Sequence, residues 1–219
     1  MTLLNATLTT GFGVIVQDAA VTDTASDQPI GQVDKIVTML DQKVIAAGCG
    51  SLLALRAWQI AAPRVGLTTA EIADATPELL RAIVGGLPAD SYRDFTLVMI
   101  GFTAGSLAGW AFQGDNDFRP EPIVPNGGHL ILPCELDTAD RDYSDLVAMS
   151  APAAVGLEIE RFHAGLALNQ HSAQQRGLLR SKSCIGGPVT MAHIDQRGVI
   201  TKREIARLPT MANEMHLVA

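Results

Sequence analysis

The chain has 219 residues, of which 47% are hydrophobic and 18% charged, and its formal net charge at pH 7 is -7. A chain of this length can bury a sizeable core, and no linker divides it, so we expect one domain over residues 1–219. The acidic balance argues against a nucleic-acid partner, because phosphate binding requires clustered basic residues.

The cysteines and the apolar segments exclude other classes of protein. The three cysteines are widely spaced, without a C-x-x-C pair or a matching group of histidines. This pattern predicts neither a disulfide framework nor a metal site, and we expect no cofactor. No apolar segment reaches the roughly 20 residues that cross a bilayer, so we expect no membrane partner and a cytoplasmic location.

The first element combines a strand pattern with a residue that could act as a nucleophile. Residues 6–18 read ATLTTGFGVIVQD, with β-branched residues at 14–16 and glycines at Gly11 and Gly13. This pattern predicts a buried strand that runs to Asp18, followed by a hairpin turn, with a close backbone approach at the glycines. Thr9 is either a plain strand residue or a nucleophile, and the pattern alone leaves both open.

The next part of the chain changes from strands to helices. We expect a polar loop over 22–31 and short strands at 35–37 and 44–48. A helix over 51–62 begins at the N-cap Ser51 and is expected to stop at Pro63. Thr68 and Glu71 form a capping box for a second helix over 69–86.

The second half returns to strands around one further helix. Strands are expected at 95–101 and 107–113, with a short strand at 129–132 after a long loop. A helix over 150–175 would begin at the N-cap Ser150 with Pro152 in its first turn, and closing strands follow at 189–194 and 199–201. Strands in blocks, with helices between the blocks, predict an α+β fold of antiparallel sheets covered by helices.

Several segments resemble the proteasome β subunits and their bacterial relatives, which are N-terminal nucleophile (Ntn) hydrolases. The matching segments include Thr9-Thr10-x-x-Gly13, Asp18, Lys35-Ile36, VIAAGCGS over 44–51 and IGGPVTMAHID over 185–195. The resemblance implies a four-layer αββα sandwich, in which two antiparallel sheets are flanked by helices.

The resemblance also implies a catalytic site. Thr9 would be the nucleophile after cleavage of the Leu8–Thr9 bond, and Lys35 would supply a positive charge that lowers the proton affinity of the site. The backbone N–H groups of Gly48 and Gly50 would hold the oxyanion, and Asp23 is the nearest carboxylate to the family's acid. An alternative for Lys35 is a solvated lysine at a strand end.

Two functions follow from these observations. The first is a non-catalytic subunit that assembles into a homo-oligomer or larger particle, such as a virion, and a mean hydropathy of +0.21 favours this assembly. The second is a threonine-type peptidase or amidohydrolase. We favour the first, because Ser150 alone represents the family's Gly-Ser-Gly segment. In addition, Thr9 has no free α-amine while the Leu8–Thr9 bond is intact.

Overall fold

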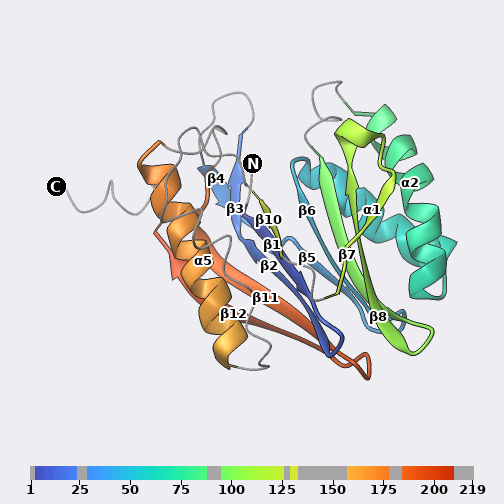
Figure 1. The fold of residues 1–219 in the computed structure, drawn as a ribbon. Helices are drawn as coiled ribbons and strands as arrows, with labels where there is room; N and C mark the ends of the chain where they lie inside the picture. The colour runs from blue at the N-terminus through green and yellow to red at the C-terminus, as the bar shows by residue number, and fades with distance from the viewer. Residues whose placement is uncertain are drawn as a thin grey trace.

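A computed structural model of the chain shows two antiparallel sheets packed face to face, with helices on both outer faces (Figure 1). The structure describes residues 3–23, 29–87, 95–125, 129–132, 157–177 and 184–209. The strand orders are β10-β1-β2-β11-β12 in the first sheet and β5-β6-β7-β8-β9 in the second, and β3 pairs with β4. The predicted α+β, four-layer arrangement is confirmed.

The first sheet is covered by α5, and the second sheet is covered by α1 and α2 (Figure 1). The first sheet contains β1 (Leu4–Leu8), β2 (Phe12–Asp18), β10 (His129–Leu132), β11 (Gly187–Asp195) and β12 (Ile200–Leu208). The second contains β5 (Ile36–Met39), β6 (Val44–Cys49), β7 (Thr96–Thr103), β8 (Ser106–Gln113) and β9 (Pro120–Pro122). The remaining elements are β3 (Ala20–Thr22), β4 (Pro29–Gln32), α1 (Leu52–Val65), α2 (Thr69–Gly85), the short helix η1 (Gly114–Asn116) and α5 (Leu157–Gln175).

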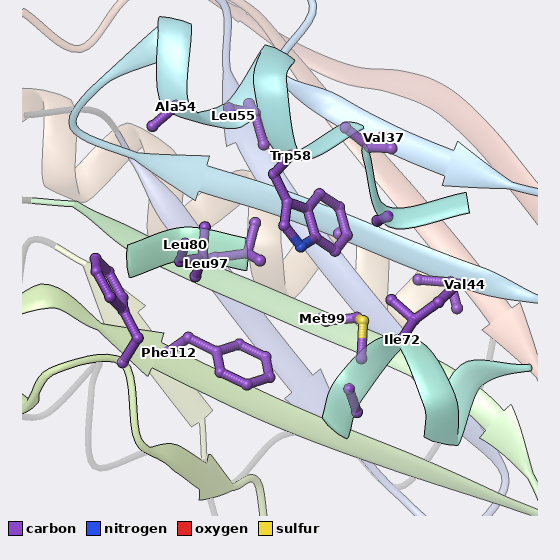
Figure 2. Close-up of a cluster of buried hydrophobic side chains, with 14 of the residues drawn as sticks. Val37, Val44, Ala54, Leu55, Trp58, Ile72, Leu80, Leu97, Met99 and Phe112 are labelled. Carbon is purple, nitrogen blue, oxygen red and sulfur yellow. The ribbon is translucent and has the colours of Figure 1, made fainter. Parts of the chain in front are cut away.

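Three hydrophobic clusters fill the spaces between the four layers. The middle cluster joins the two sheets through residues such as Ile15, Ile45 and Ile100. On the α1/α2 side, the indole of Trp58 is fully buried above the second sheet (Figure 2) and donates to the Thr76 hydroxyl at 3.1 Å. The third cluster packs α5 on the first sheet. Each sheet is thus apolar on both faces, as expected for a layer covered on both sides.

The opening strand is a hairpin rather than the single strand that the sequence predicts. β1 pairs with β2 from Leu4↔Gln17 to Leu8↔Gly13, and residues 9–11 form the turn. The expected close approach at Gly13 is confirmed, because a Cβ atom there would lie 2.5 Å from Ile100 of the facing sheet. The predicted hairpin after Asp18 is wrong, since the next strand, β3, pairs with β4.

The helix boundaries also differ in part from the sequence prediction. α1 continues past Pro63 to Val65, because a proline in the last turn removes one hydrogen bond without ending the helix. The capping box at Thr68 and Glu71 is confirmed. α5 is described from Leu157, so the predicted cap at Ser150 and Pro152 lies outside the described residues.

Candidate active site

The carboxylate of Asp18 gathers three backbone amides at the end of β2. Its Oδ1 accepts from Leu3 N at 2.9 Å, and its Oδ2 accepts from Ala20 N at 3.2 Å and Gly186 N at 3.1 Å. The side chain is fully buried. Hydrogen bonds from several amides stabilise a buried carboxylate. Asp18 therefore fixes the residue before β1, the start of β3 and the residue before β11 around one charged group.

Lys35 is the buried cation beside this carboxylate. Its Nζ lies 3.6 Å from Asp18 Oδ1, donates to the carbonyl oxygen of Ala20, and the side chain is 7% exposed. Burial lowers the pKa of Lys35, and the attraction of Asp18 raises it. The alternative of a solvated strand-end lysine is therefore wrong. A buried amine with a lowered pKa is a common component of catalytic sites.

Gly48 lies beside the same end of β2. The side chain of Gln17, which precedes Asp18, donates from Nε2 to Gly48 O at 2.5 Å. The pairing of β5 with β6 runs from Met39↔Val44 to Ile36↔Ala47, and Gly48 lies just beyond it. A side chain at Gly48 would crowd the ring of Phe95 at 3.1 Å. The predicted oxyanion glycine is thus bound to the residue before Asp18, at the same end of β2.

Gly50, the second predicted oxyanion residue, has a role in the turn into α1. Its φ of 101° lies in the left-handed region that favours glycine, and the residue is exposed. Ser51 follows as the N-cap, with its hydroxyl accepting from Ala54 N at 3.2 Å. Gly50 therefore reverses the chain so that α1 can begin directly after β6.

Two thiols lie near Lys35. Cys49 and Cys184 are both buried and are not joined in a disulfide. Each interacts electrostatically with Lys35. Burial raises the pKa of the Cys184 thiol, and the charge of Asp18 raises it further. Because the thiolate is the reactive form of cysteine, Cys184 is poorly suited to be the nucleophile of this site.

The structure separates Thr9 from Lys35. Thr9 closes the β1–β2 turn, where its hydroxyl accepts from Phe12 N at 3.0 Å and Gly11 N at 3.2 Å and donates to Phe12 O at 3.1 Å. β2 has 7 residues, so at about 3.3 Å per residue its two ends lie about 20 Å apart. Thr9 is at one end of this hairpin, and the Asp18–Lys35 pair is at the other.

Asp18, rather than the predicted acid Asp23, is the carboxylate that faces Lys35. Asp23 follows β3 and is partly exposed. The sequence pattern places Asp18 before a hairpin turn and does not predict that it faces Lys35. The antiparallel register supplies the missing signal, because Leu4 lies opposite Gln17 and the chain before Leu4 must approach Asp18. The predicted contribution of Ser150 lies outside the described residues.

Neither a metal site nor a membrane-spanning helix is found within the described ranges. No group of three or more His, Cys, Asp or Glu residues there is placed to hold a metal ion. No described helix is both long enough and apolar enough to span a membrane.

Comparison with solved structures identifies the fold. No protein-family model and no curated protein sequence matches the chain. Anbu from Yersinia bercovieri, an ancestral β-subunit, is similar with a TM-score of 0.67 at 11% identity, over 98% of this chain and 90% of that chain. A mutant of Anbu from Hyphomicrobium sp. strain MC1 is similar with a TM-score of 0.67 at 14% identity, over 94% of this chain and 88% of that chain.

A second structure of Anbu from the same Hyphomicrobium strain has a TM-score of 0.65 at 12% identity, over 94% of this chain and 88% of that chain. The chain therefore has the proteasome-like Ntn-hydrolase fold of Anbu, as the sequence resemblance implied. At these identities the similarity establishes the fold alone, so the function must be argued from the residues of the site.

Proposed function

We propose that the protein is a threonine-type Ntn hydrolase that cleaves amide bonds, with Thr2 rather than Thr9 as its nucleophile. The observation that carries this proposal is the buried Asp18–Lys35 pair, with the backbone N–H of Leu3 bound to Asp18 at 2.9 Å. Thr2 itself lies outside the described residues, and it is the residue that directly precedes Leu3.

Covalent geometry links Thr2 to this pair. Consecutive Cα atoms in a trans peptide chain are about 3.8 Å apart, so residue 2 is joined directly to the residue that Asp18 holds. Leu3 is fully buried, and its N–H is bound to Asp18. Thr2 is therefore one residue from a backbone amide that is bound to Asp18, whereas the Thr9 hydroxyl lies in the turn at the other end of β2.

The chemistry requires cleavage of the Met1–Thr2 bond. The freed α-amine of Thr2, or a water bound to it, accepts the hydroxyl proton while the oxygen attacks the substrate carbonyl carbon. The positive charge of Lys35 favours the deprotonated hydroxyl, and the N–H of Gly48 is suited to stabilise the oxyanion. The proton then passes to the leaving amine, and water hydrolyses the ester to regenerate Thr2.

The sequence alone favours a non-catalytic subunit, whereas the proposed site favours an enzyme. The intact Leu8–Thr9 bond counted against activity only if Thr9 is the nucleophile, and Thr9 is part of a turn in this structure. In contrast, a buried lysine held by a buried carboxylate has a high desolvation cost. A catalytic function for Lys35 accounts for this cost better than a purely structural one.

The test combines mass measurement with amide hydrolysis. We expect the intact mass of the purified protein to lack Met1, and the protein to hydrolyse members of a panel of fluorogenic peptide amides. Lys35→Gln should reduce this activity by a factor of about 100 or more. Lys43→Gln, at an exposed lysine in the β5–β6 turn, is the matched control and should retain activity. Protein that has lost Met1 but hydrolyses no amide in the panel would contradict the proposal.

A second function, self-assembly, is favoured by the outer face of α1. Leu53 and Ile60 are two turns apart on this helix and are 70% and 61% exposed, and Leu67 beyond its end is 81% exposed. Leu53 and Ile60 share one face of the helix, and large apolar side chains exposed on one face mark interaction surfaces in soluble proteins. We infer that α1 contacts a second copy of the chain in a homo-oligomer.

Light scattering of variants tests this assembly. Ile60→Glu should shift the wild-type oligomer towards monomer, because it places a charge in the apolar contact. Leu168→Glu is the matched control, since Leu168 is 50% exposed on α5, which covers the other sheet. A monomeric wild type at micromolar concentration, or an equal effect of both variants, would contradict the assembly.

A further inference from the structure

The backbone on both sides of Ile185, next to Asp18, is held by the side chains of a helix. The N–H of Ile185 donates to Gln174 Oε1 at 2.9 Å, and the carbonyl oxygen of Ile185 lies 3.0 Å from His171 Nδ1. Because a carbonyl oxygen can only accept, His171 Nδ1 carries a proton in this contact. His171 and Gln174 are one turn apart on α5, so a single helix face binds both backbone polar groups of Ile185.

The same backbone segment reaches the candidate active site through its next residue. Gly186 N donates to Asp18 Oδ2 at 3.1 Å, and Gly186 O accepts from Ala20 N at 3.1 Å. The pairing of β11 with β2 begins further on, at Val189↔Asp18. Residues 185 and 186 therefore precede the paired part of β11, and their position depends on the contacts with α5 and with Asp18.

Ala20 connects this backbone segment to the lysine. Its N–H is shared between Gly186 O and Asp18 Oδ2, and its carbonyl oxygen accepts from Lys35 Nζ. A continuous set of hydrogen bonds thus runs from α5 through Gly186 to the carboxylate and to the ammonium group. Among the described residues, His171 and Gln174 are hydrogen-bonded to Ile185 and not to Lys35 itself.

We propose that His171 and Gln174 are positioning residues that set the geometry of the Asp18–Lys35 pair by holding the backbone N–H and carbonyl groups of Ile185. This inference rests on the proposed function for its catalytic consequence. Loss of either side chain frees this backbone segment on the α5 side, so that Asp18 loses a fixed amide donor and its carboxylate is oriented less well towards Lys35. A small misplacement of a catalytic group has a large effect on rate.

The experiment uses the full chain and two readouts. The first is the titration of Lys35, followed by NMR of its side-chain amine and assigned by comparison with Lys35→Gln, which needs no catalysis. The second is kcat and KM for an amide substrate. Gln174→Leu removes the acceptor for Ile185 N–H, and His171→Leu removes the donor to Ile185 O. Gln175→Leu makes the same chemical change at an exposed neighbour and is the control.

We expect Gln174→Leu and His171→Leu to move the Lys35 midpoint to lower pH by about half a unit or more, because the attraction of a well-placed Asp18 raises the pKa of Lys35. The value of kcat should fall about tenfold with KM within about twofold. Gln174→Glu keeps an oxygen acceptor and should restore kcat. The control should match wild type in both readouts.

An unchanged Lys35 midpoint in folded Gln174→Leu and His171→Leu would overturn the inference. An equal fall of kcat in Gln175→Leu would overturn it as well. If the wild type has no hydrolase activity after loss of Met1, the proposed function fails, but the titration still decides whether α5 positions the pair. The two failures are therefore distinguishable.

Discussion

At each end of the β1–β2 hairpin, a side-chain oxygen accepts hydrogen bonds from backbone amides. The two ends differ in how far along the sequence these amides lie. At the turn, Thr9 binds Gly11 and Phe12, two and three residues away in sequence. At the other end, Asp18 binds Leu3, 15 residues away, and Gly186, 168 residues away. A local cap only closes a turn, whereas a buried charge that joins distant strands can build a site.

The largest expected effect comes from removing this charge. Asp18→Ala should destabilise the protein by about 3–5 kcal/mol, because it removes the buried charge that faces Lys35 and leaves the amides of Leu3 and Gly186 without this acceptor. Urea unfolding of the wild type and the variant measures this difference. The double variant Asp18→Ala/Lys35→Met should recover part of the loss, since no buried charge remains.

Asp23→Ala is the matched control for this prediction. Asp23 follows β3 and is partly exposed, so we expect a change of about 1 kcal/mol or less. Equal losses for Asp18→Ala and Asp23→Ala would show that the Asp18 end has no special importance for the fold.

A smaller effect is expected at the turn end. Thr9→Ala removes a hydroxyl that accepts from two amides and should cost about 1 kcal/mol of stability. Amide hydrolysis, corrected for the folded fraction, should be unchanged, because the hydroxyl lies at the end opposite Lys35. Thr10→Ala, at the exposed neighbouring threonine, is the control and should cost less. A folded Thr9→Ala protein without activity would sink the assignment of Thr9 to the turn alone.

The smallest expected effect is a pH dependence of the free energy of unfolding, and its source also lies near the turn end of the hairpin. His193 stacks on Phe12 with ring centroids 5.8 Å apart, and its buried Nε2 has no hydrogen-bond partner in the described part of the chain. Burial lowers the pKa of His193, which nearby Asp195 raises in part. The unfolded chain therefore binds more protons than the folded one as pH falls below about 6.5.

This linkage predicts that the free energy of unfolding falls from pH 7.5 to pH 5.5 and that His193→Phe makes the fall shallower. Denaturant unfolding at several pH values measures both slopes. A wild-type slope that His193→Phe leaves unchanged would rule out His193 as a source of acid sensitivity.

The features that the sequence predicted well are those determined by neighbours in the chain. The capping box at Thr68 and Glu71 acts within one turn, and the β7–β8 hairpin around Ala104 and Gly105 follows from alternating strand residues and a turn. The antiparallel layers followed from the order of these elements. Local chemistry determines such features, and their prediction required no knowledge of the tertiary structure.

The candidate site depends on contacts that a single sequence does not reveal. The pattern Thr9-Thr10-x-x-Gly13 led to Thr9 as the predicted nucleophile. The sequence carries only a weak turn signal at residues 9–11, so the hairpin turn that contains Thr9 was not predicted. The partner of Lys35 became clear only when the fold brought Asp18 and Gly186 together. Once the register is known, the residue before Leu3 is the natural candidate for the nucleophile.

Mapping the position of a covalent adduct tests the central claim most directly. The purified protein is incubated with an epoxyketone, an electrophile selective for an N-terminal threonine, then digested and sequenced by mass spectrometry, with Thr9→Ala and Lys35→Gln treated in parallel. We predict an adduct on Thr2 in the wild type and in Thr9→Ala, and a large reduction in Lys35→Gln. An adduct on Thr9, or labelling of Thr2 that does not depend on Lys35, would contradict the site proposed at the Asp18 end of the hairpin.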